Sequence, residues 1–344
     1  MTEPGGSGVI PTDTFSSSLR AKAVRLETRE LLITDFRGSD QEQDLTRPPN
    51  CDGFGRIRHF RRATSEGWPE NPLPIDPACH ALGLPRADIL EAQVFQSSAC
   101  NWRCWYCFVP FELLGAKESR GAWLTPATLV SKYLEERERP RTIDLTGGQP
   151  DLTPEWVPWT MEALRERGVD RDVYLWSDDN LSNDYYFRYL TDSDREKIAG
   201  YPMYGRVCCF KGFNSSSFSF NTKAAPELFD RQFELFRMLL AEGLDLYAYA
   251  TFTTPQLERI ADDMARFVDR LQEIDPRLPL RTVPLEIQVF SPVAPRVRDE
   301  HEVAMRHQLI ARDEWTRQLE NRFSSAELSQ PIYGVKLGQR GDAS

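Results

Sequence analysis

At residues 98–108 the chain reads Ser-Ala-Cys-Asn-Trp-Arg-Cys-Trp-Tyr-Cys-Phe, which places thiols at Cys100, Cys104 and Cys107. Thiolates are the preferred soft ligands of iron–sulfur clusters, and a short loop carrying three of them can wrap one face of a four-iron cube. Three cysteines leave one iron of such a cube open to another ligand. Two other interpretations remain: half of a zinc site, which needs a fourth ligand, and three unrelated buried thiols.

The composition limits the class of protein. The 344 residues suit one large domain, alone or with a smaller unit, and 40% hydrophobic residues can fill its core. No apolar run reaches the ~20 residues of a membrane span, and the first thirty residues lack a signal-peptide pattern. We therefore expect a cytoplasmic protein with reduced cysteines. The net charge of −10 argues against a nucleic-acid substrate, because phosphate binding relies on Lys and Arg.

From Ala92 onward the sequence alternates between strand and helix patterns. The predicted strands are 92–97, 142–146, 173–176, 206–210, 246–251 and 285–290. The predicted helices lie between 125 and 136, 153 and 168, 226 and 242, 254 and 271, and 300 and 322. Strand–helix alternation at this spacing predicts parallel strands joined by crossover helices. The expected fold is an α/β partial (β/α)6 barrel with an irregular N-terminal extension and a C-terminal helix.

We divide the chain into four parts. Residues 1–20 are rich in Gly, Ser and Thr and predict a disordered tail. Residues 21–88 form the N-terminal extension, 89–298 the barrel, and 299–344 the C-terminal helix and tail. The basic run Arg56–Arg62 in the extension fits a solvated strand face or a site for an anionic substrate.

The pattern Cys100-x3-Cys104-x-Tyr106-Cys107 resembles the signature of the radical S-adenosylmethionine (SAM) superfamily, Cys-x3-Cys-x-aromatic-Cys. The resemblance implies that the three cysteines ligate a [4Fe–4S] cluster, with SAM on the fourth iron and Tyr106 beside it. It further implies one-electron cleavage of SAM to a 5′-deoxyadenosyl radical that takes a hydrogen atom from the substrate. A flavodoxin- or ferredoxin-type protein is the implied electron donor. The superfamily has the same partial barrel.

Chemistry in such folds lies at the C-terminal ends of the strands. The second predicted strand is followed by Gly147-Gly148-Gln149-Pro150, where the superfamily usually has Gly-Gly-Glu-Pro in contact with the methionyl amino group. The two glycines allow close approach of a ligand to the backbone. Gln149 keeps a carbonyl acceptor for an ammonium group but lacks the negative charge.

Three other strand ends carry predicted SAM contacts. Ser177 and Asp178 follow the third strand, where polar groups suit SAM, although an Asx turn explains them equally well. Lys211 after the fourth strand matches a lysine near SAM in the activating enzymes of glycyl-radical proteins, the group that this chain resembles most in pattern. Val289 and Phe290 on the sixth strand are expected adenine contacts, though a buried core strand would look the same.

Three functions remain open. The first is a radical SAM enzyme acting on a small molecule or a peptide. The second is an activase that installs a glycyl radical on a partner protein. The third is a non-catalytic protein that binds the cluster and SAM. The four other cysteines do not form the C-terminal array of SPASM-type enzymes; they are Cys51, Cys79, Cys208 and Cys209. The length of the N-terminal extension favours the first function.

Overall fold

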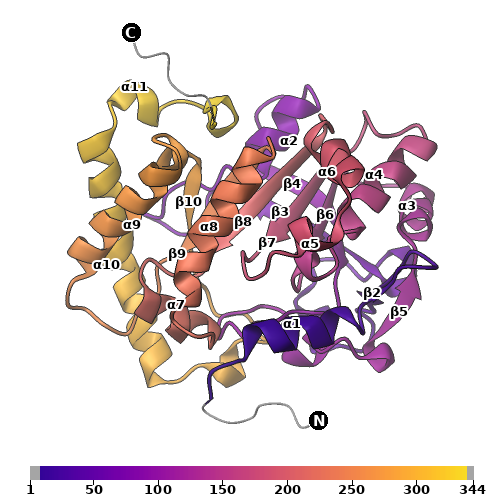
Figure 1. The fold of residues 1–344 in the computed structure, drawn as a ribbon, viewed down its shortest axis with the longest axis horizontal. Helices are drawn as coiled ribbons and strands as arrows, with labels where there is room; N and C mark the ends of the chain where they lie inside the picture. Colours follow the sequence, from indigo (N-terminus) through magenta and orange to yellow (C-terminus); the bar gives the residue numbers. More distant parts are fainter. Residues whose placement is uncertain (1–7, 339–344) are drawn as a thin grey trace.

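The computed structural model describes residues 8–338, and the centre of this part of the chain is a curled seven-stranded sheet (Figure 1). Its strands, in spatial order, are β10 (Thr282–Leu285), β9 (Leu246–Thr251), β8 (Tyr204–Phe210), β7 (Tyr174–Asp179), β6 (Thr142–Thr146), β4 (Ile89–Gln96) and β3 (Gly55–Arg61). In this sheet β4, β6, β7, β8, β9 and β10 pair in parallel, each with the next, and β3 pairs antiparallel with β4. Six parallel strands in chain order confirm the predicted partial barrel.

Helices connect the parallel strands and cover one face of the sheet (Figure 1). They are α3 (Pro126–Glu135), α4 (Trp156–Glu166), α5 (Tyr185–Tyr189), α6 (Asp192–Ala199), α7 (Ser215–Thr222), α8 (Leu228–Ala241) and α9 (Ile260–Ile274). The helix α3 begins where the sequence predicts, because the side chain of Thr125 accepts a 3.1 Å hydrogen bond from the N–H of Thr128. Gly168, with a φ of +67°, follows the end of α4.

Side chains of β8 alternate between the helices and the inner face of the sheet. The ring of Phe210 lies 5.0 Å from Phe233 and 5.7 Å from Phe236, both on α8, and 5.8 Å from Phe267 on α9. Successive residues of a strand point to opposite faces. Cys209 therefore points away from the helices, into the concave inner face of the half-barrel.

The N-terminal segment is ordered, contrary to the sequence prediction. Thr12–Arg20 form the helix α1, so the expected tail over 1–20 is wrong for these residues, while 1–7 lie outside the described residues. Arg20 contacts Glu155 and donates a 3.1 Å hydrogen bond to the carbonyl oxygen of Leu152. Leu19 is buried in a small core with Leu32 and Leu152. Tertiary contacts with distant residues thus stabilise a segment whose composition suggested disorder.

The extension over 21–88 contributes to both sheets of the molecule. A small antiparallel sheet contains β1 (Val24–Arg25), β2 (Glu30–Thr34) and β5 (Gly121–Leu124). The strand β3, followed by α2 (Ile75–Ala81), extends the barrel sheet itself. Arg56 on β3 and Arg62 directly after it are only 6% and 4% exposed, so the expectation of a solvated strand face is wrong. Arg62 is buried because it pairs with Asp76 and the carbonyl oxygen of Ala87.

The C-terminal part contains α10 (Asp299–Arg322), close to the predicted helix, and α11 (Ser325–Leu328). The ring of Trp315 on α10 lies 5.5 Å from Phe252 and 6.1 Å from Phe267. This contact fixes α10 against α9. Among residues 8–338, no helix combines the length and the apolar character that crossing a membrane requires.

Two predicted boundaries differ most from the observed ones. The sixth strand ends at Leu285 instead of Phe290, because Leu285 pairs with Thr251, the last residue of β9, and no facing strand continues beyond it. The helix expected from 254 begins at Ile260, because Arg259 has a left-handed backbone with a φ of +69°.

Candidate active site

The cysteine loop, residues 97–108, follows the C-terminal end of β4. The N–H of Cys100 donates a 3.1 Å hydrogen bond to the carbonyl oxygen of Leu114, and the N–H of Cys107 donates one of 3.0 Å to that of Cys104. Cys100, Cys104 and Cys107 are all free and partly exposed. The loop therefore presents three thiols at the mouth of the half-barrel.

Burial and neighbouring charges shift the pKa values of the loop thiols. Burial raises the pKa of Cys100, and it raises that of Cys104 to about 12. A thiolate at Cys107 raises both pKa values further, whereas the cation of Lys211 lowers them. Within residues 8–338, no group of three or more His, Cys, Asp or Glu side chains is arranged around a single metal-ion position. Three neighbouring thiols fit a cluster whose irons each take one of them.

The glycine turn, Gly147–Gly148, packs directly on the cysteine loop. Both glycines have left-handed backbones, with φ values of +65° and +89°. A Cβ atom on Gly148 would lie 2.5 Å from the carbonyl oxygen of Ala99 and 2.8 Å from that of Ser97. We expected these glycines to allow close approach of a ligand. At Gly148 the close neighbour is instead the backbone of the cysteine loop.

The side chain of Gln149 has protein partners at both ends of its amide. Its Nε2 donates a 2.8 Å hydrogen bond to Oδ1 of Asp179, and its Oε1 accepts one of 2.9 Å from the N–H of Asn180. Gln149 is 1% exposed. Pro150 next to it begins a buried turn, where its carbonyl oxygen accepts a hydrogen bond from the N–H of Thr153. Gln149 thus ties the glycine turn to the end of β7.

The two polar residues predicted after the third strand point to opposite faces. The hydroxyl of Ser177 lies 2.7 Å from that of Tyr204, away from the inner face. Asp178 points inward and accepts a hydrogen bond from the hydroxyl of Thr146. Burial raises the pKa of Asp178, whereas the cation of Arg58 opposes this shift. Of the pair, only Asp178 lies on the inner face, with the site.

Lys211 lies on the inner face between the cysteine loop and Asp178. Burial lowers its pKa, but negative charge on Cys209, Tyr106, Cys104 and Asp178 raises it well above its ordinary value. The hydroxyl of Tyr106 lies 3.2 Å from that of Thr251 at the end of β9. Lys211 and Tyr106 thus lie next to the thiols of the cysteine loop.

The two predicted adenine contacts do not lie in a buried strand. Val289 and Phe290 follow the end of β10 and are 45% and 48% exposed. Their neighbours Ile287 and Val293 are buried instead and pack with Trp105 of the cysteine loop. The segment after β10 therefore packs on the cysteine loop through Ile287 and Val293, whereas Val289 and Phe290 are about half exposed.

The helix α1, which the sequence analysis missed, is bonded to the cysteine loop. The indole N–H of Trp102 donates a 3.1 Å hydrogen bond to Oγ1 of Thr12. The amide of Asn101 donates to Oγ of Ser16 at 2.9 Å and to Oγ of Ser182 at 2.7 Å. The available sequence signal was the apolar pair Phe15 and Leu19, at the helical spacing i, i+4.

The inner face also carries a cluster of buried or partly buried ionisable side chains, Arg56, Arg58 and Asp144, which the sequence predicted only in part. Arg56 pairs with Val94 and Val94 with Asp144, so these side chains share a face. Nη1 of Arg58 lies 3.3 Å from Oδ2 of Asp144. Burial and the charge of Asp178 raise the pKa of Asp144 to about 8, against the opposing effect of the two arginines. The sequence indicated the arginines, but strand pairing brings the aspartates to them.

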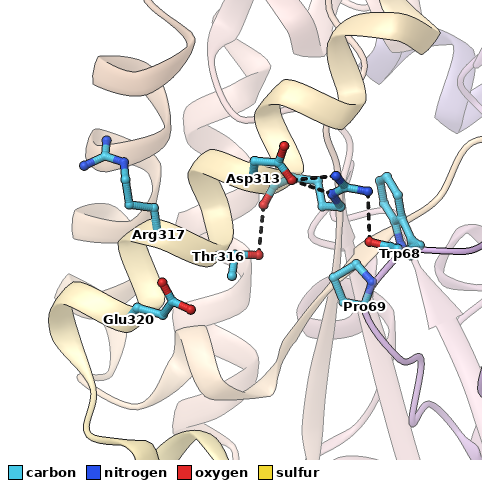
Figure 2. A pocket seen from close by; sticks show the side chains of 8 residues that line it. Trp68, Pro69, Asp313, Thr316, Arg317 and Glu320 are labelled. Atoms are coloured by element: carbon cyan, nitrogen blue, oxygen red, sulfur yellow. Dashed lines mark hydrogen bonds and ion pairs between the residues drawn. The ribbon is translucent and has the colours of Figure 1, made fainter.

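A surface cavity of about 480 Å³ lies apart from these residues, against α10 (Figure 2). Trp68 and Pro69 line one side, and Arg312 on α10 donates a 2.9 Å hydrogen bond to the carbonyl oxygen of Gly67. None of the predicted cluster or SAM residues lines this cavity. It is separate from the candidate site.

No family model and no curated protein sequence matches the chain. Solved structures that match include Streptococcus suis SuiB bound to S-adenosylmethionine, with a TM-score of 0.38 and 17% identity over 53% of this chain and 37% of that one. SuiB bound to its precursor peptide SuiA matches with a TM-score of 0.38 and 16% identity, over 53% and 36% of the two chains. The matched part is little more than a third of the SuiB chain.

Proposed function

We propose that this protein is a radical SAM enzyme that acts on a small molecule or a peptide. The observation that carries the proposal is the arrangement of Cys100, Cys104 and Cys107 at the mouth of a six-stranded parallel half-barrel, seated on a double-glycine turn. Three thiols on one loop can hold three irons of a [4Fe–4S] cluster and leave the fourth for SAM. When bound, the cluster supplies the electron that cleaves SAM to a 5′-deoxyadenosyl radical, which takes a hydrogen atom from the substrate.

The residues on the inner face have separate tasks in this proposal. Lys211 supplies a fixed cation next to the thiols, suited to the SAM carboxylate, and Asp178 offers an acceptor for SAM hydroxyl or ammonium groups. Gly147 to Pro150 contribute main-chain groups, while the Gln149 side chain positions the end of β7 through Asp179 and Asn180. The main-chain contacts of the glycine turn with the cysteine loop support a role for the turn in orienting that loop.

Apolar residues over the cysteine loop exclude water. The ring of Trp105 stacks on His301 of α10 with centroids 4.4 Å apart and packs against Ile287 and Val293. A dry site protects a reactive radical from side reactions. The contact of Arg296 with the carbonyl oxygen of Cys107 further holds the covering segment on the loop.

The test is anaerobic reconstitution followed by reduction with SAM present. We expect about four irons per chain and the release of 5′-deoxyadenosine under reducing conditions. Candidate substrates deuterated at the reactive carbon should transfer deuterium to 5′-deoxyadenosine. A chain with no cluster, or with a cluster that does not cleave SAM, would contradict the proposal. An activase would instead cleave SAM only with a partner protein that then shows a glycyl radical signal in electron paramagnetic resonance.

A further inference from the structure

Arg56 carries buried donor groups that have no acceptor. In the described part of the chain, its Nε and Nη2 atoms are buried and make no hydrogen bond, and neither does the buried Oδ1 of Asp144. A guanidinium stays charged and presents a rigid fork of N–H donors. Buried charges and donors are normally paired, because leaving them unpaired costs free energy. The unpaired atoms of both residues therefore indicate a ligand with matching groups.

The unpaired fork lies beside the cysteine loop. The guanidinium carbon of Arg56 is 5.4 Å from the centre of the Phe108 ring, and that of Arg58 is 5.9 Å from the same ring. Phe108 directly follows Cys107 in the sequence. Cations over aromatic rings are held in place by the ring quadrupole. The two guanidinium groups therefore border the segment that carries the thiols.

Arg56 lies deeper in the half-barrel than the residues predicted to bind SAM. Its partner Val94 is paired with Asp144, whereas Gln96, at the end of β4, is paired with Thr146, just before the glycine turn. Along the strands, Arg56 and Asp144 thus lie level with Val94, two residues further from the mouth than Gln96 and Thr146. This depth suits the substrate, which must lie on the inner face within reach of the reacting carbon of SAM.

We propose that Arg56 and Arg58 bind a carboxylate of the substrate on the inner face, an inference that rests on the proposed radical SAM function. Oδ1 of Asp144 accepts an N–H of the same molecule. Ligands that carry a carboxylate close to an N–H group include amino acids and the C-terminal residue of a peptide. A phosphate group fits less well, because it offers no N–H to the unpaired Oδ1 of Asp144 and so matches only the arginines.

The test measures thermal stabilisation of the reconstituted, SAM-saturated protein by N-acetylglycine, which carries one carboxylate and one amide N–H. We expect a saturable rise in Tm with N-acetylglycine and none with N-acetylglycinamide, which lacks the carboxylate. Arg56→Gln should weaken the response at least tenfold. Arg61→Gln is the matched control, because Arg61 lies on the same strand but is exposed, and it should retain the response. Iron content and SAM affinity of Arg56→Gln should equal those of the wild type.

Several results would overturn the inference. The first is a wild-type Tm that does not rise with N-acetylglycine. The second is an Arg56→Gln variant whose rise in Tm is as large as that of the wild type. The third is a larger rise in Tm with inorganic phosphate than with N-acetylglycine. A tenfold loss of SAM affinity in Arg56→Gln would assign the arginines to the SAM carboxylate instead. If that variant does not fold, Arg58→Gln replaces it, since the Arg58 side chain is 29% exposed. The same titration is repeated on the protein without iron and SAM. A chain that builds no cluster but still shows the carboxylate-dependent rise in Tm would contradict the proposed function and leave the carboxylate site intact.

Discussion

The main-chain N–H of Gln149 donates a 2.7 Å hydrogen bond to the carbonyl oxygen of Ala99, the residue before Cys100. This bond joins the glycine turn after β6 to the cysteine loop after β4. Gly148 packs against the same carbonyl oxygen. The position of the first thiol therefore depends on a turn that lies far from it in the sequence.

Replacing a thiol of the loop should abolish cluster binding. Alanine at Cys100, Cys104 or Cys107 removes one iron ligand, so we expect the iron content after anaerobic reconstitution to fall from about four per chain to near zero. Cys208→Ala is the control, because Cys208 is buried on the helix side of β8 and should leave the iron content unchanged. A full cluster in any of the three loop variants would remove the basis of the proposed function.

Gly148→Ala should destabilise the protein more than alanine at another left-handed glycine. Gly243 has a φ of +80° and open space around its Cβ position, so Gly243→Ala should cost about 1–2 kcal/mol of backbone strain. Gly148→Ala adds a clash with two backbone carbonyls, and we expect a total loss of about 3–5 kcal/mol in the free energy of unfolding. Urea denaturation of both variants measures the difference. Equal losses would mean that the contact with Ala99 is unimportant.

Gln149→Glu should be destabilising in a way that depends on pH. The new carboxylate would replace the Nε2 donor and face Asp179, so its folded-state pKa should be raised above the unfolded value. A raised carboxyl pKa means that stability is lost as pH rises, and we expect a further loss of about 2 kcal/mol between pH 5 and pH 8. Gln149→Ala, which is uncharged, should show a loss that does not change over this range. Denaturation at several pH values compares the two variants.

Asp144 should make the stability of the wild type fall with pH. Its pKa is raised from 3.8 to about 8, so its contribution is complete below pH 3.8 and disappears as pH rises through about 8. Relative to Asp144→Asn, the wild type should lose about 3–4 kcal/mol between pH 5 and pH 8. Asp88→Asn, at a side chain that is 89% exposed, should keep the wild-type profile. Parallel pH profiles for the wild type and Asp144→Asn would contradict this prediction.

Thr12→Val should weaken the attachment of α1 to the cysteine loop. Valine keeps the shape of threonine but leaves the buried indole N–H of Trp102 without its acceptor, so we expect a loss of about 1–3 kcal/mol. Reconstitution should yield less iron, because α1 braces the loop. Thr14→Val on the exposed side of the same helix is the matched control and should change stability by no more than about 0.5 kcal/mol. Wild-type stability in Thr12→Val would show that the helix does not support the loop.

Much of the barrel was predictable because its signals are local. The strands β6 and β9 have the predicted bounds, and α3 begins at its Thr-Pro cap. Predictions failed where a distant partner decides the outcome. Ser177 and Asp178 are adjacent, yet the pleat of β7 sends only Asp178 to the inner face, and nothing in their residue types indicates which one.

The sequence by itself determined the cysteine spacing, the strand–helix order and therefore the half-barrel with three thiols after its first parallel strand. These follow from periodicity and spacing along the chain. Only the tertiary structure decided that Thr12 supports Trp102, that Gln149 has protein partners, and that two donors of Arg56 lie unpaired beside Phe108. The reason is physical: burial and hydrogen bonding of a side chain depend on residues distant in sequence, which strand pairing and helix packing bring together.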